Sequence, residues 1–378
     1  MASTTSTRLS LDDVRRLRAR SQRLAGGAAS HEQGVAPVVE AVCGVQAQDR
    51  RAAALAVRAR TAGLTVGDVE REQVAERSLV RTWAMRGTFH LLAAEDVRWL
   101  MALLGPVFVA AGRRRFAELG LDEDQCARGV RAVVHALDRH GSRARAELAD
   151  DLRAAGLPVD GGGRVVTHLV RRAALEGLLC VGPDRDGDEA YVLVDDWLPP
   201  GRRPALAGDA ALAELGRRYL TAYGPAGPHD LAAWSGLPVA RARRAWELLA
   251  GELTEVSVEG ARAWVLSGRR AAGGTGGRGP SVRLLPAFDT YLLGYRRREW
   301  QLDDRHARRV WPGGGWIHPT LVVDGRVVAT WRLSSTRVVV EPFEALGPAL
   351  LPPLDREAAD VGRFLGRSTA LALASGDR

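Results

Sequence analysis

Gln46 and Gln48, separated by one residue, are the side chains whose type and spacing suggest joint chemistry in this sequence. In a helix, residues i and i+2 point in well-separated directions, whereas in an extended segment they share a side. The pair can therefore present two neutral amides to one small object only where the backbone leaves the helix. Gly44 is expected to end a helix over 35–43 just before them. The alternative is that both are ordinary surface amides.

A second group of polar and aromatic residues lies in the segment 79–92. Its alternation, with Gly87 at a bend, predicts a hairpin. The candidates on it are Arg81, Trp83, Arg86, Thr88 and His90. Arg86 could grip a phosphate, and His90 could orient a glutamine or contact backbone. The alternatives stay open: a structural wing, Trp83 as core rather than stacking platform, and His90 as a satisfied, half-buried histidine.

These two groups carry a resemblance to a known family. Gln-Ala-Gln at 46–48, followed by Arg-Thr-Trp and Arg-Gly-Thr-x-His at 81–83 and 86–90, resembles the winged-helix DNA glycosylases of the AlkZ type. That family unhooks interstrand crosslinks and is linked to azinomycin self-resistance. Runs at 285–295, 318–320 and 324–331 resemble the same family, so the resemblance spans nearly the whole chain.

The resemblance implies that Gln46 and Gln48 are catalytic, with the hairpin residues and Asp49 around them. Physical chemistry supports this for one substrate class. A purine alkylated at its position-7 nitrogen is cationic and leaves as a neutral base, so no general acid is needed. Two amides, which do not titrate, suffice to hold water and stabilise a positively charged sugar. A related branch of the family has Asp at the second position; here Asp49 is one residue further on and remains the alternative acid–base residue.

Composition favours an anionic partner. The formal net charge is +8 and the sequence pI about 10.3, which suits nucleic acid, although a merely basic protein is the alternative. All 53 Lys+Arg residues are arginine, which excludes a lyase that uses a lysine Schiff base. Three scattered cysteines indicate no disulfide framework and fit a reducing cytoplasm. We expect no metal, no cofactor and no membrane span, and a cytoplasmic, nucleoid-associated monomer.

The order of predicted elements indicates an α+β protein with three tandem winged-helix units, a small, partly open β-barrel and a C-terminal helix. The expected parts are residues 1–121, 122–204, 205–267 and 281–378, with a Gly- and Arg-rich linker over 268–280. The terminal helix is expected over 355–373. The tip of the second wing, residues 184–189, is acidic, so we expect phosphates to repel it.

Other basic residues are candidate contacts to double-stranded DNA carrying alkylated or crosslinked purines. They are Arg50, Arg51, Arg296, Arg297, Arg298 and His318. Ordinary exposed charge would explain them equally well. The rival functions are a winged-helix transcriptional regulator and a protein that binds damaged DNA without cutting it. A regulator should footprint one sequence, whereas a repair enzyme should prefer alkylated duplex of any sequence.

Overall fold

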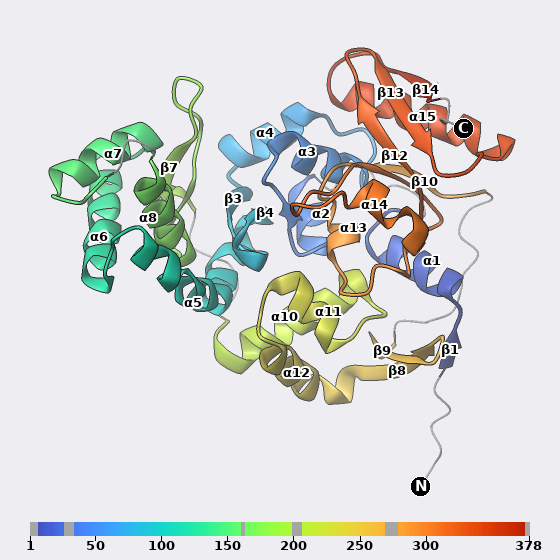
Figure 1. The fold of residues 1–378 in the computed structure, drawn as a ribbon, viewed down its shortest axis with the longest axis horizontal. Coiled ribbons are helices and arrows are strands. Elements are labelled where there is room, and N and C mark those ends of the chain that lie inside the picture. Colours follow the sequence, from blue (N-terminus) through green and yellow to red (C-terminus); the bar gives the residue numbers. More distant parts are fainter. Residues whose placement is uncertain (1–6, 26–33, 160–162, 199–205, 269–278, 375–378) are drawn as a thin grey trace, which may run out of the picture. The chain divides into compact units, whose positions relative to one another are not determined.

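The computed structural model describes residues 7–25, 34–159, 163–198, 206–268 and 279–374 (Figure 1). Most of the predicted linker, residues 269–278, lies outside them. The chain forms two compact units, one made of Met1–Val69 with Ala213–Arg378 and the other of Glu70–Leu212. These boundaries differ from the four expected parts because the hairpin near residue 80 shares a sheet with strands near residue 180. The division into winged-helix units stays a prediction.

The first unit opens with helices whose caps are visible in the sequence. They are α1 (Leu11–Ser21), α2 (Ala36–Ala41) and α3 (Arg50–Arg58); β2 (Val45–Gln46) lies between the last two, and α4 (Val66–Val74) crosses the unit boundary. Ser10 and Asp13 form a reciprocal capping box on α1. At the start of α3, the Asp49 carboxylate accepts a 3.0 Å hydrogen bond from the Ala52 backbone N–H. The predicted helices near 9–24, 35–43 and 51–62 are confirmed to within a few residues.

Two buried arginines anchor α3 to the C-terminal part of the same unit. Arg60 pairs with Asp289 through two 2.8 Å hydrogen bonds, and both side chains are fully buried. Arg58 contacts Glu357 at 3.1 Å and Asp360 at 3.0 Å, and donates to the Leu284 carbonyl. A planar guanidinium fits a carboxylate in this two-pronged way, so the direction of α3 is fixed by geometry as well as charge.

A second helical group follows in this unit. It consists of α10 (Gly208–Tyr223), α11 (Pro228–Ser235) and α12 (Val239–Leu248), then strands β8 (Leu253–Val258) and β9 (Ala261–Leu266). The order of three helices and a hairpin is the expected one. One strand was not expected: β1 (Thr7–Leu9) adds to β8 in parallel, giving the order β1-β8-β9. The chain's first described residues thereby pack into the third expected unit.

The C-terminal part is a five-stranded sheet of order β10-β11-β12-β13-β14. Its strands are β10 (Val282–Leu285), β11 (Thr320–Val323), β12 (Arg326–Leu333), β13 (Arg337–Pro342) and β14 (Ala370–Leu373), and α13 (Thr290–Leu293) and α14 (Ala307–Val310) lie between the first two in sequence. Asp324 and Gly325, with φ of 49° and 84°, make the predicted tight turn between β11 and β12. Among the described residues the sheet does not close, which is compatible with the partly open barrel that we expected.

The C-terminal helix is shorter than predicted. Helix α15 (Leu351–Phe364) packs on the sheet and on α3, but it ends before Gly366, whose φ is +69°. The Arg367 N–H then caps the Gly362 carbonyl at 2.9 Å. The remaining segment, predicted as helix to residue 373, instead forms β14 in parallel with β13. The prediction was wrong there because an alternating Ala-Leu run can satisfy the free edge of β13, which a helix cannot.

The second unit contains two hairpins in one sheet, with strands in the order β4-β3-β6-β7-β5. The strands are β3 (Leu79–Trp83), β4 (Phe89–Ala93), β5 (Arg143–Ala144), β6 (Leu179–Val181) and β7 (Ala190–Leu193); the helices are α5 (Ala94–Glu118), α6 (Glu123–His140), α7 (Arg145–Ala154), α8 (Arg164–Leu175) and α9 (Val194–Trp197). The two hairpins meet where Arg81 of β3 pairs with Val181 of β6. Figure 1 shows α5 to α8 gathered beside this sheet.

Helix α5 crosses α8 at very short range. A Cβ at Gly105 would overlap the Leu175 carbonyl, so only glycine allows this approach. Ten residues of α5 are buried, among them Trp99, Leu103 and Phe108. The predicted connector helix over 94–119 is therefore confirmed, and it is a packed element of the second unit rather than a free spacer.

Candidate active site

The Gln-x-Gln corner lies where α2 ends and α3 begins. The chain turns through Cys43 and Gly44, with φ of 53° and 96°, and the Gly44 N–H donates to the Val39 carbonyl at 2.9 Å. A short extended segment follows and ends at Asp49, the N-cap of α3. The backbone therefore leaves the helix at this corner, which is the condition for two amides at i and i+2 to share a side.

Burial alternates along this extended segment. Val45 and Ala47 are 1% exposed, whereas Gln46 is half-buried and Gln48 is exposed. The apolar side chains fix the segment to the core, and both glutamine side chains remain reachable from solvent. Two features hold the corner on either side: Tyr223 OH donates to the Val42 carbonyl at 2.9 Å, and the Arg60–Asp289 pair secures the far end of α3.

Asp49 has a structural task here. Its carboxylate caps α3, and an N-cap carboxylate also interacts favourably with the positive end of the helix. Arg50 and Arg51 are the first two residues of α3, and both side chains are exposed. All five residues from 46 to 51 that were singled out from the sequence thus lie on one continuous surface corner of the first unit.

The predicted hairpin residues lie in the second unit, on β3, β4 and the turn between them. Thr82 pairs with His90, and Trp83 with Phe89. Arg86 and Gly87 at the tip have φ of 57° and 64°, and the turn is closed by a 2.9 Å bond from the Ala84 N–H to the Thr88 carbonyl. The hairpin prediction is confirmed.

Two of these side chains have packing partners that the sequence did not reveal. Arg81 is 7% exposed; its guanidinium pairs with Glu189 and lies 3.9 Å from the centroid of the Phe89 ring. Trp83 is 6% exposed and stacks with Phe89 and Tyr191 at centroid distances of 3.8 and 6.4 Å. Of the alternatives left open for Trp83, the structure supports the core residue. The acidic second wing supplies the carboxylate for Arg81.

His90 is 2% exposed and its Nδ1 lies 3.0 Å from the Thr88 carbonyl. Burial, with a smaller effect from the nearby Arg86 guanidinium, lowers the pKa of His90 to about 3. The ring is therefore neutral at physiological pH. Because a carbonyl oxygen only accepts, Nδ1 carries the proton and Nε2 is left as an acceptor. Thr88, half-buried, donates its hydroxyl to the Met85 carbonyl at 3.1 Å.

The C-terminal candidates lie in the first unit. Arg296, Arg297 and Arg298 are exposed; Arg297 is 3.9 Å from Glu299, and the Arg298 guanidinium lies over the Trp311 ring at 4.7 Å. His318 is half-buried, and the exposed Trp316, which follows the glycines 313–315, packs edge-on against Phe288. The sequence had not singled out Trp316 or Trp311.

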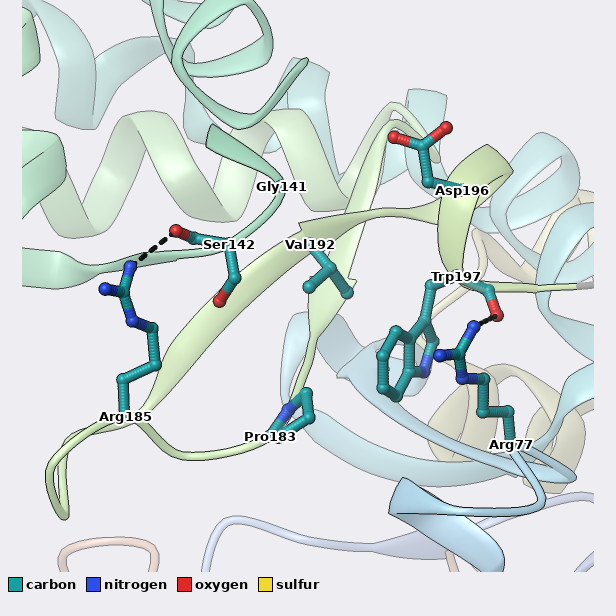
Figure 2. Close-up of a pocket in the computed structure, with 8 residues that line it drawn as sticks. All are labelled: Arg77, Gly141, Ser142, Pro183, Arg185, Val192, Asp196 and Trp197. Carbon is teal, nitrogen blue, oxygen red and sulfur yellow. Dashed lines mark hydrogen bonds between the residues drawn. The ribbon is translucent and has the colours of Figure 1, made fainter. Parts of the chain in front are cut away.

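Two cavities open in the second unit. The first, of about 400 Å³, has Trp197 and Arg77 on one side and Arg185 and Ser142 on the other (Figure 2). The second, of about 630 Å³, is lined by Arg145, Arg153, Glu189 and Tyr191 among others. No predicted site residue lines either cavity.

The described residues place limits on other chemistry. Among them, no three His, Cys, Asp or Glu side chains gather so as to hold a metal ion. The cysteines Cys43, Cys126 and Cys180 are all buried as free thiols. Within the same residues, every helix is too short or too polar to cross a bilayer.

Comparison with known proteins identifies the family and supports the fold. The family model "DNA glycosylase AlkZ-like" matches residues 39–364. An interstrand DNA cross-link repair glycosylase from Streptomyces sahachiroi is 33% identical over 346 residues, which are 88% of this chain and 91% of the relative. The structure of Streptomyces sahachiroi DNA glycosylase AlkZ matches with a TM-score of 0.85 at 30% identity, covering 97% of this chain and 100% of that one.

These matches define the class first: the chain is a DNA glycosylase, an enzyme that hydrolyses N-glycosidic bonds. Within that class it belongs to the AlkZ-like family. The resemblance seen in the sequence is thereby confirmed. The matches agree with a mixed α and β fold.

Proposed function

We propose that this protein is a monofunctional DNA glycosylase that removes cationic 7-alkylpurines and unhooks interstrand crosslinks formed through such purines. It acts as a cytoplasmic, nucleoid-associated monomer on double-stranded DNA. The observation that carries the proposal is the accessible Gln46-x-Gln48 corner in a chain of this family. The cross-link repair named for the Streptomyces sahachiroi relative supports the substrate class.

In the proposed reaction the damaged nucleotide leaves the base stack, which costs a few kcal/mol and costs least at a damaged pair. The C1′–N9 bond then breaks and its electron pair passes to the cationic purine, which departs neutral. The sugar is left positively charged at C1′. Water adds to C1′ and releases a proton to solvent. An abasic site and a free base are the products.

Gln46 and Gln48 are proposed to position the attacking water and to stabilise the positively charged sugar. Their amide oxygens accept hydrogen bonds from the attacking water and face the developing positive charge, while their amide N–H groups orient the sugar. Neither amide titrates, so the pair works over a wide pH range. The substrate provides its own leaving-group activation, and no residue has to donate a proton to the purine.

The basic residues complete the proposal by holding the duplex. Arg50 and Arg51 border the glutamine corner, and the exposed Arg296, Arg297 and Arg298 extend the cationic surface of the same unit. Such contacts hold phosphates and carry no sequence information. His318 and the neighbouring glycine loop are proposed to enter a groove. In the second unit, Arg86 is proposed as a phosphate contact, whereas Arg81, Trp83, Thr88 and His90 shape the hairpin that carries it.

Replacing Gln46 and Gln48 together by Ala tests the catalytic assignment. We expect release of 7-methylguanine from methylated duplex to fall by at least about 100-fold, because the water and the charged sugar lose their polar partners. Affinity for undamaged duplex should stay within about twofold. Release is measured as free base, and affinity by fluorescence anisotropy. Release at the parent rate would refute the assignment.

A matched control uses Gln73, a half-buried glutamine on α4 that lies outside the corner. Gln73→Ala removes an amide of the same kind and should leave release unchanged. A parent protein that binds methylated duplex tightly yet releases no base would instead be a damage-binding protein. Protection of one specific sequence in a footprint would favour a regulator.

A further inference from the structure

Helix α8 presents a basic face that the proposed reaction does not use. Its residues Val165, Val166, Leu169 and Val170 are buried, whereas Arg164, Thr167, His168 and Arg171 are exposed or half-buried. The four outward residues follow the spacing i, i+3, i+4, i+7, which places them on one side of a helix. It is the third helix, after α6 and α7, of the winged-helix unit expected over 122–204, and in homeodomain-type folds the third helix is the one that contacts DNA.

Arg171 is the centre of this face. Its Nε and Nη2 both donate to the Gly87 carbonyl, each at 3.3 Å. Burial lowers the pKa of its guanidinium, and among the described residues no carboxylate pairs with it. The next residue on the helix shows the contrast, because Arg172 pairs with both Glu123 and Glu176. Arg171 is thus a partly desolvated cation, and two of its five donors share one carbonyl acceptor.

The tip of the first hairpin is shaped around this guanidinium. A Cβ at residue 87 would overlap the Arg171 side chain, and the φ of +64° also favours glycine there. Arg86 directly precedes Gly87, so the hairpin tip carries a second arginine next to the residue that Arg171 contacts. The glycine of the Arg-Gly-Thr motif at 86–88 is therefore in direct contact with Arg171 of α8.

Helix α5 adds another cation. Arg115 Nε lies 3.4 Å from His168 Nε2, and the His168 ring packs edge-on against Phe116. Burial and the charges of Arg115 and Arg171 lower the pKa of His168. The ring is therefore neutral and adds no further positive charge beside the two guanidinium groups. Arg115 also contacts Glu118 at 3.0 Å, an exposed pair of small energetic value.

We propose that Arg171, with Arg115 and the hairpin tip at Gly87, forms a clamp for a phosphate of the DNA backbone. A phosphate oxygen matches the forked guanidinium donors and neutralises a cation that has no carboxylate partner here. The clamp rests on the proposed function and adds a binding site in the second unit. It positions the duplex and is not catalytic. Because phosphates are the same in every sequence, the contact is independent of sequence.

The test compares Arg171→Gln and Arg115→Gln with Arg114→Gln. Arg114 lies on the same helix as Arg115, pairs with the same Glu118 and has a 91% exposed side chain. All three variants remove one positive charge, so the net charge is matched. The probe is an undamaged 20-base-pair duplex, with Kd measured at several salt concentrations.

We expect Arg171→Gln to weaken binding about tenfold at low salt. The slope of log K against log salt should fall by about 0.9, the value for one phosphate contact. Arg115→Gln should give a smaller change in the same direction, and Arg114→Gln less still. Single-turnover release of 7-methylguanine at saturating DNA should stay within about twofold of the parent, because the clamp acts on binding.

The clamp is refuted if Arg171→Gln and Arg115→Gln show the same affinity and slope as Arg114→Gln. Should Arg171→Gln fail to fold, Arg115→Gln alone decides, because the Arg115 side chain is 44% exposed. These binding measurements stand apart from catalysis. A protein that binds through the clamp but releases no base would contradict the proposed function and leave the clamp intact.

Discussion

Arginine is the only basic side chain besides histidine in this protein, and its planar fork is used in several ways. Arg60 is fully buried against Asp289, Arg81 is held between Glu189 and the Phe89 ring, and Arg171 faces a carbonyl. A lysine would give one point charge in place of two directed donors at each position. Arg60 and Arg81 are buried against carboxylates and are structural, whereas Arg171 has a backbone carbonyl as its acceptor and is proposed to bind phosphate.

His90 gives a prediction at the scale of one residue. Its pKa is lowered to about 3 in the folded protein, against about 6.5 in an unfolded chain. Between these values the unfolded state binds more protons, so stability falls as pH drops from about 6.5 toward 3. We expect His90 to contribute up to about 1.4 kcal/mol of lost stability per pH unit in that window. His90→Gln should remove this contribution.

The measurement is urea unfolding of the parent and His90→Gln at pH 7 and pH 5. The free energy of unfolding should fall less in the variant between the two pH values, even if the variant is less stable at pH 7. His135→Gln, an exposed histidine on α6, is the control and should follow the parent. An equal fall in parent and His90→Gln would show that His90 is not buried in its neutral form.

At the scale of elements, α3 connects the proposed chemistry to the core. Its N-terminal end carries the glutamine corner, and its C-terminal end is fixed by Arg58 and Arg60. The residue between corner and helix, Asp49, is either a cap or an acid–base catalyst, and the two roles make different demands. A cap needs a side-chain oxygen at the right place, whereas a base needs a carboxylate.

Asp49→Asn separates the two roles. Asn caps helices about as well as Asp but cannot accept a proton, so the variant should release 7-methylguanine within about threefold of the parent. Asp49→Ala should lower the free energy of unfolding by about 1 kcal/mol, because the Ala52 N–H loses its acceptor. Base release and thermal unfolding are measured on both variants. Loss of release in Asp49→Asn with unchanged stability would make Asp49 the base.

The two hairpins of the second unit form another element-scale feature. They share one sheet, and Trp83, Phe89 and Tyr191 stack across them. The acidic second wing therefore helps to hold the first hairpin. Its Glu189 is one acidic residue whose charge is used inside the unit.

At the scale of the whole molecule, the absence of lysine predicts the products. A glycosylase that also cuts the strand forms a Schiff base between an amine and the sugar, and no side-chain amine is present in the 378 residues. We expect the damaged strand to stay intact until hot alkali is added. Sodium borohydride should trap no covalent protein–DNA complex. Both outcomes are read on denaturing gels, with a lysine-dependent glycosylase as positive control.

Trapping of a covalent complex that depends on borohydride would contradict this prediction.

The net charge of +8 gives a second expectation for the whole molecule, that its binding to DNA weakens steeply as salt is raised. The salt dependence of the parent therefore serves as the reference for the clamp variants.

The sequence alone determined the local features of this protein. Capping residues, paired positive-φ turns such as Asp324-Gly325, and apolar periodicity placed nearly every helix and hairpin, because these signals act within a few residues. The Gln-x-Gln spacing likewise required a break in the helix, and the break is there. The family followed from short motifs in their order.

Only the tertiary structure decided which of these features meet. The Arg60–Asp289 pair, the Arg81–Glu189 pair and the contact of Arg171 with Gly87 join residues more than 80 positions apart, and no local pattern encodes such distances. The same holds for β1 and β14, short strands whose pairing depends on a free sheet edge elsewhere in the chain. The fold decides which groups surround each of these residues, so their burial, their charge environment and their pKa values became known only with the structure.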